Sequence, residues 1–102
     1  MSTQTTRSNA FGMSDTAKTP KGKLKCKTES QKLVAANPGR VALVVSNIGT
    51  TDVWLVLGAE AAVAEEGPYL KKEGGSQIID YYTGEIRAIS KESEPTLTYA
   101  EI

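Results

Sequence analysis

Short runs of β-favouring residues, each ended by turn residues, constrain the fold of this chain more than any other feature. No apolar pattern with a helical period is sustained for the length of an ordinary helix. The turns are rich in Gly, Pro, Asn and Ser, which favour the backbone angles of tight turns. The sequence therefore predicts an all-β fold, an antiparallel β-sandwich or jelly roll of about seven short strands. The predicted strands cover residues 31–36, 40–46, 53–57, 68–70, 76–81, 85–90 and 96–102.

The run at residues 40–46 is apolar on both faces. Its odd-numbered valine and leucine residues share one face, and Ala42 and Val44 share the other. Apolar residues on both faces predict a central strand. The run at residues 53–57 follows after a polar turn, so we expect the two to pair as a hairpin. Residues 59–66 have a helical composition but are too few before the next glycine and proline, which predicts a surface loop.

Charge is unevenly distributed along this chain of 102 residues, although its formal net charge is zero. Residues 1–28 contain six basic side chains and one acid, formally +5, whereas residues 29–102 are formally −5. Residues 1–19 also have few large apolar side chains with which to offset the entropy of ordering. We therefore predict an extended basic N-terminal arm at 1–28 and a β-sandwich domain at 29–102. Such a distribution favours head-to-tail contact between copies or capture of an acidic partner.

Four lysines alternate with smaller residues near the end of the predicted arm. Period two places them on one face of an extended strand and the intervening leucine on the other. They indicate either a solvated edge strand that blocks pairing with other chains, or a strand held against an acidic protein surface. Nucleic acid is not the expected partner, because no aromatic residues are interleaved and the remaining chain is acidic. The candidate partner-binding residues of the arm are Arg7, Lys18, Lys21, Lys23, Leu24, Lys25 and Lys27.

The composition also excludes several kinds of site. Cys26 is the only cysteine and the chain has no histidine, so it has no disulfide framework and almost no zinc chemistry. We expect a reducing compartment, no metal and no cofactor. No apolar run approaches the roughly 20 residues of a membrane span, and the N-terminus lacks the apolar stretch of a signal peptide. We therefore expect a soluble chain without a secretory leader or a membrane partner.

No residue pattern predicts catalysis. Glu65 and Glu66 are adjacent, and neighbouring acids in a strand or loop point apart, which indicates solvated charge instead of an acid–base pair. Cys26 lies between two lysines but has no histidine or other base to activate it, which indicates an inward-facing thiol. Gly74 and Gly75 form a turn without the context of a phosphate-binding loop. We therefore expect that the chain is not an enzyme.

Aromatic residues offer a second kind of candidate surface. We take Trp54, Tyr69 and Tyr82 as possible interface residues. An aromatic platform for sugars would make the chain a carbohydrate-binding module. Trp54, however, lies inside an apolar strand, which favours a core or interface position. Tyr81 and Tyr82 face opposite ways in an extended chain, so only one of them can join a platform.

The order of several motifs resembles a known family. The residues that carry this resemblance are 37–47 (NPGRVALVVSN), 53–58 (VWLVLG), 74–76 (GGS), 83–90 (TGEIRAIS) and the closing alternating strand. They resemble small β-sandwich virion proteins of tailed bacteriophages, most closely capsid decoration, or cement, proteins. The resemblance covers roughly residues 33–102 and leaves out the arm.

This resemblance implies a structural protein of the virion, assembled in the host cytoplasm and located on the capsid surface. Such a protein binds the outer surface of the major capsid protein lattice, bridges neighbouring subunits and contacts other copies of itself as a trimer or dimer. The basic arm fits this role, because a flexible segment that orders on binding can bridge subunits and add avidity. The alternative is a receptor- or glycan-binding module of a phage tail or fibre. A small enzyme is the third and weakest hypothesis.

Overall fold

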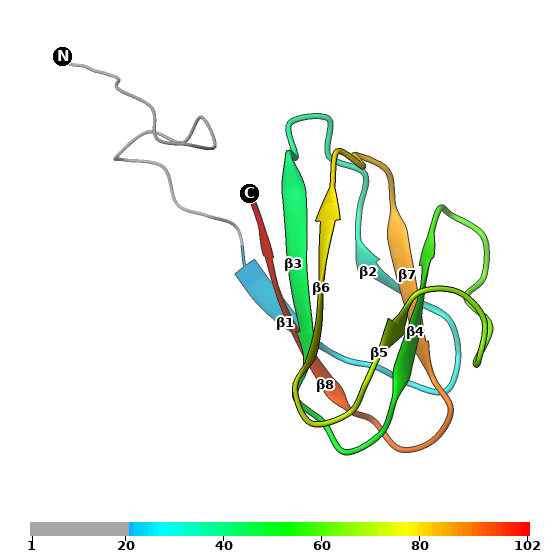
Figure 1. Cartoon of the computed structure of the whole chain (residues 1–102). Coiled ribbons are helices and arrows are strands. Elements are labelled where there is room, and N and C mark those ends of the chain that lie inside the picture. The colour runs from blue at the N-terminus through cyan, green and yellow to red at the C-terminus, as the bar shows by residue number, and fades with distance from the viewer. Residues whose placement is uncertain (1–20) are drawn as a thin grey trace, which may run out of the picture.

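The computed structural model describes residues 21–102, which form eight antiparallel strands and no helix (Figure 1). The described part of the chain therefore contains no helix of the length and hydropathy needed to cross a membrane. The all-β prediction is confirmed, with one strand more than the sequence predicted. The strands are β1 (Lys21–Lys25), β2 (Gln31–Val34), β3 (Ala42–Asn47), β4 (Val53–Leu57), β5 (Tyr69–Leu70), β6 (Gly75–Asp80), β7 (Ile86–Ser90) and β8 (Thr96–Glu101).

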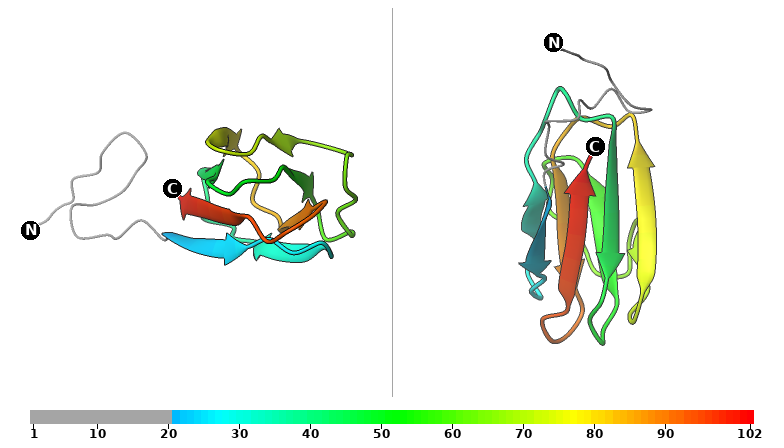
Figure 2. Two further views of the ribbon diagram at one scale, coloured as in Figure 1. Left: turned by 90° about the horizontal axis from the view of Figure 1, so that it is seen from below. Right: turned by 90° about the vertical axis from the view of Figure 1, so that its left-hand side faces the viewer.

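The strands form two four-stranded sheets around one core. The first sheet has the order β1-β8-β3-β6 and the second the order β2-β7-β4-β5. The right-hand view of Figure 2 shows the first sheet with β1 at one edge and β6 at the other. Alternate residues of each strand point inward and join a single apolar cluster. Its largest members are Leu43, Val45 and Leu97 from the first sheet and Val53, Leu55, Leu70 and Ile86 from the second.

The chain changes sheet at every connection except the one between β4 and β5. The predicted hairpin between residues 40–46 and 53–57 is therefore wrong, because β3 and β4 lie in different sheets. Asn47 provides the physical reason. Its fully buried side chain donates from Nδ2 to the carbonyl oxygens of Thr51 (2.8 Å) and Leu70 (3.1 Å). Its Oδ1 accepts from Gly49 N (2.9 Å), so the amide bends the connection towards the second sheet.

Arg40 organises the opposite end of the molecule. Its side chain is fully buried, and its Nε lies 2.8 Å from Glu101 Oε1 at the end of β8. Its Nη1 donates to the carbonyl oxygens of Tyr82 (3.0 Å) and Gly84 (3.1 Å), and its Nη2 to that of Ala35 (2.7 Å). One guanidinium thus ties together the β2–β3 connection, the β6–β7 connection and the last strand.

The domain begins earlier in the sequence than predicted. Residues 21–25 form β1, which pairs with β8 along its whole length. Leu24 packs against the core, and Cys26 is fully buried within it. The domain thus includes residues 21–28, which we had assigned to the arm. Residues 59–66, predicted as a surface loop, lie within a loop at residues 58–68 that contains no helix or strand.

Candidate functional site

A row of lysines lies along the outer side of β1. Lys21, Lys23 and Lys25 are exposed, whereas the residues between them are half-buried. Gly22 lies beneath the ring of Tyr99, where a Cβ atom would come within 2.6 Å of the tyrosine hydroxyl oxygen. The period-two prediction therefore holds within the strand, and pairing with β8 fixes the lysine row on a rigid edge.

Lys27 lies beyond the end of β1 and is also exposed. Its backbone N donates to Gln31 Oε1 (2.6 Å), and its carbonyl oxygen accepts from Ser90 N (2.9 Å). The backbone of this lysine is therefore fixed, while its side chain lies on the surface of the described structure. Arg7 and Lys18, the other two predicted basic residues, lie outside the described residues.

The residues in line with Lys21 and Lys23 across the first sheet carry no charge. Cross-strand register places Ala100, Val44 and Ile78 in one line with Lys21 across the outer face of the first sheet. The next line contains Thr98 and two serines beside Lys23. These small side chains leave a shallow hollow of about 230 Å³ next to Lys21. A partner can therefore approach Lys21 and Lys23 over these uncharged residues.

Cys26 is not a nucleophile in this setting. Burial raises the pKa of its thiol to about 12, so the thiol is protonated at neutral pH. Its Sγ lies 3.9 Å from the carbonyl oxygen of Lys27. The inward-facing thiol predicted from the sequence is confirmed. Within residues 21–102, no group of three potential ligands among Cys, Asp and Glu is arranged to hold a metal ion.

Two of the three candidate aromatic residues meet on the outer face of the second sheet. The ring centroids of Trp54 and Tyr69 are 5.6 Å apart at an interplanar angle of 42°, and Tyr69 is 42% exposed. Desolvation raises the pKa of the Tyr69 hydroxyl, with a hydrogen bond and the charge of Asp52 as further causes. Tyr82 does not join them, because it packs against the core and donates from its hydroxyl to the Glu85 carbonyl oxygen (3.0 Å).

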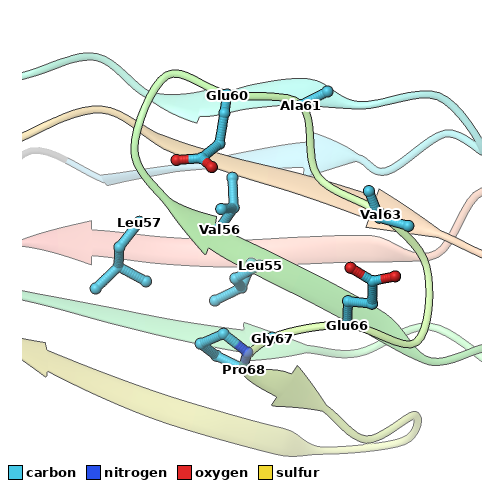
Figure 3. Close-up of a pocket in the computed structure, with 9 residues that line it drawn as sticks. All are labelled: Leu55, Val56, Leu57, Glu60, Ala61, Val63, Glu66, Gly67 and Pro68. Carbon is cyan, nitrogen blue, oxygen red and sulfur yellow. The ribbon is translucent and has the colours of Figure 1, made fainter.

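A pocket that the sequence did not predict lies between β4 and the 58–68 loop (Figure 3). It has a volume of about 480 Å³ and mostly apolar walls, which include Val56, Val63 and Pro68. The carboxylates of Glu60 and Glu66 face the space between loop and strand. Carboxylates above apolar walls suit a ligand with an apolar body and a polar or cationic group.

Contacts distant in sequence hold this loop in place. Ala62 N donates to Ser30 Oγ (2.9 Å), and Leu55 N donates to the carbonyl oxygen of Pro68 (2.8 Å). Glu65, which we had interpreted as solvated charge, is exposed and pairs with Lys91 Nζ at 2.7 Å. The hydrogen bond to Ser30 spans 32 residues. No local pattern within residues 58–68 signals that contact.

Comparison of the chain with known protein families, curated proteins and solved structures found no match.

Proposed function

We propose that this chain is a structural virion protein that binds the outer surface of a phage capsid and bridges neighbouring subunits of the major capsid protein. The observation that carries this proposal is the lysine row of β1, which lies beside uncharged residues of β8 and β3. A fixed line of cations on a flat surface suits contact with an extended acidic protein surface better than it suits a small ligand.

The strand order supports the finer fold proposal, a jelly roll. In that architecture eight strands form two four-stranded sheets, and most connections cross between them. The orders β1-β8-β3-β6 and β2-β7-β4-β5 follow the same scheme. Folds of this class occur in viral capsid proteins and in lectins. The fold is therefore compatible both with the capsid role and with its alternative.

Capsid binding is tested by co-sedimentation with purified capsids of the phage whose genome encodes the chain. The structure guides the truncation: removal of residues 1–20 leaves β1 and the lysine row in place, whereas removal of 1–28 also removes core residues. If the lysine row of β1 anchors the protein, the chain that begins at Lys21 still binds capsids, and this binding weakens as salt is added. Failure of the full-length chain to bind capsids at low salt would overturn the proposal.

A glycan-binding module is the second candidate, favoured by the Trp54–Tyr69 pair. This pair adjoins the pocket, because pocket-lining Pro68 directly precedes Tyr69 and pocket-lining Val56 lies on the same face of β4 as Trp54. Aromatic faces beside carboxylates are suited to stacking on a sugar ring and binding its hydroxyl groups. A glycan array tests this candidate: specific binding that is lost in Tyr69→Ala supports it, and an array without specific binding rejects it.

A further inference from the structure

The four sheet edges formed by residues 21–102 are not protected to the same degree. Exposed edge strands tend to pair with other chains, and proteins prevent this with lysines, bulges or very short strands. β1 carries the lysine row, and β5 is only two residues long. β2 has an exposed Lys32 and a register shift between Lys32 and Val34. Three of the four edges thus carry a protective feature.

β6 has none of these features within the described structure. It is six residues long and pairs with β3 without a register shift. Its only charged residue is the last one, Asp80, and Ile78 near its middle is 66% exposed. A regular edge with a single charge at its end and an exposed isoleucine near its middle is the kind of edge that another strand can extend.

The backbone of β6 offers hydrogen-bonding groups at this edge. Tyr81 N donates to the carbonyl oxygen of Val41 (2.8 Å), so the odd-numbered residues of β6 direct their N–H and C=O groups towards β3. Ser76, Ile78 and Asp80 therefore direct theirs towards the free edge. Within residues 21–102, no backbone hydrogen bond outside the β3 pairing is formed by these three residues.

We propose that β6 pairs with β6 of a second copy, antiparallel and about a two-fold axis, to form a continuous eight-stranded sheet. Opposite residues in such a sheet must point to the same face, which restricts the register. With Ile78 opposite Ile78, and Ser76 opposite Asp80, all three outward-directed residues form hydrogen-bonded pairs. This register gives up to six interchain backbone hydrogen bonds, because each such pair exchanges two.

The side chains favour the same register. The two Ile78 side chains become direct cross-strand neighbours on the outer face, where apolar pairs stabilise a sheet. Each Asp80 faces a serine and not the other aspartate, so like charges are kept apart. Assembly ends at two copies, because both β6 edges are then occupied and the lysine row protects the remaining edges of the joined sheet.

This inference goes beyond capsid binding and does not depend on it. The dimer would carry the two β1 strands at opposite ends of the joined sheet. It would then present two separate lysine rows, and two simultaneous contacts on a lattice bind more strongly than either alone.

The oligomeric state of the full-length chain, measured by analytical ultracentrifugation over a concentration series, is the first test. We expect a monomer–dimer equilibrium for the natural sequence. Ile78→Lys should shift it to monomer, with at least about a tenfold increase in the dimer dissociation constant, because two lysines would then face each other. Val63→Lys, a matched control on the 58–68 loop at a position 50% exposed, should dimerise like the natural chain.

A cysteine cross-link tests the register separately. Directly opposite Cα atoms of a hydrogen-bonded antiparallel pair are about 5.5 Å apart, within the range of a disulfide. Ile78→Cys should therefore form a disulfide-linked dimer under mild oxidation, while the buried Cys26 remains free. Ser76→Cys should not, because the two Ser76 residues lie four positions apart, about 13 Å along the sheet. A monomeric natural chain, a dimer unaffected by Ile78→Lys, or equal cross-linking of both cysteine variants would overturn the proposal.

Discussion

Arg40 Nε and Glu101 Oε1 are 2.8 Å apart, and the arginine side chain has no exposed surface. The pair joins the residue shortly before β3 to the last residue of β8, 61 residues later in the sequence. A buried cation is tolerated only when its charge and its donors are all compensated. This ion pair, together with the three carbonyl oxygens that accept from Arg40, therefore closes one end of the two-sheet structure.

Glu101→Gln should lower the free energy of unfolding by about 3–5 kcal/mol, because it leaves the buried guanidinium without a counter-charge. Urea denaturation measures this loss. Glu85→Gln is the matched control, since the Glu85–Arg87 pair (2.9 Å) is only partly buried and its loss should cost less than about 1 kcal/mol. Equal losses for the two variants would show that Arg40 does not depend on Glu101.

Asn47→Ala should destabilise the fold by about 1–3 kcal/mol, because the carbonyl oxygens of Thr51 and Leu70 lose their donor at a buried position. Gln77→Ala provides the control, since this exposed amide makes a single 3.3 Å hydrogen bond to the Tyr69 carbonyl oxygen. We expect thermal denaturation to show a large decrease in Tm for Asn47→Ala only. A similar Tm for both variants would argue against Asn47 as the residue that directs the chain between sheets.

Truncation tests which residues at the start of the chain contribute to stability. A chain beginning at Lys21 should unfold at nearly the same urea concentration as the full chain. A chain beginning at residue 29 should lose at least about 3 kcal/mol, because Leu24 and Cys26 leave the core. If the shorter chain retained full stability, β1 would not be an integral strand of the domain.

The Cys26 thiol should be inert in the folded protein and should make stability depend on pH in alkaline solution. Its pKa is raised from 9.0 to about 12, so at pH 8 only about one folded molecule in ten thousand carries a thiolate. Because the unfolded chain loses this proton first, the free energy of unfolding should fall between pH 9 and 12, by at most about 1.4 kcal/mol per pH unit. The contribution is fully present below pH 9.

Alkylation at pH 8 with and without denaturant measures the first effect, and Cys26→Ala is the reference for the second. The alanine variant should show a shallower decrease in stability over the same pH range. Rapid alkylation of the folded chain, or identical pH profiles for the two proteins, would contradict the assignment of Cys26 to the core.

The strands could be predicted from the sequence because their signals are local. The run at residues 53–57 coincides with β4, and the run at 40–46 overlaps β3. Alternation of lysine with smaller residues likewise predicted which side of β1 would be exposed. These features depend on the alternation of side chains along a strand and on residue types that favour turns. Both can be recognised within a few neighbouring residues.

The arrangement of the strands and the pocket could not be predicted in the same way. The buried side-chain amide of Asn47 directs the chain to the other sheet. Nothing in the neighbouring sequence, however, distinguishes Asn47 from an ordinary asparagine in a turn. The pocket depends on the Ala62–Ser30 hydrogen bond. The unprotected edge at β6 depends on the strand order, in which β3 lies between β8 and β6 and β6 comes last. Each of these is a contact between residues far apart in the chain, without a local signal.

Capsid co-sedimentation of two charge-reversal variants tests the central claim most directly. Lys21→Glu/Lys23→Glu reverses part of the lysine row, whereas Lys71→Glu/Lys72→Glu makes the same charge change in the exposed β5–β6 turn. If the lysine row is the anchor, the first variant should bind capsids at least about tenfold more weakly than the natural chain, and the second should bind almost normally. Equal binding by both variants, or an equal loss in both, would contradict the account.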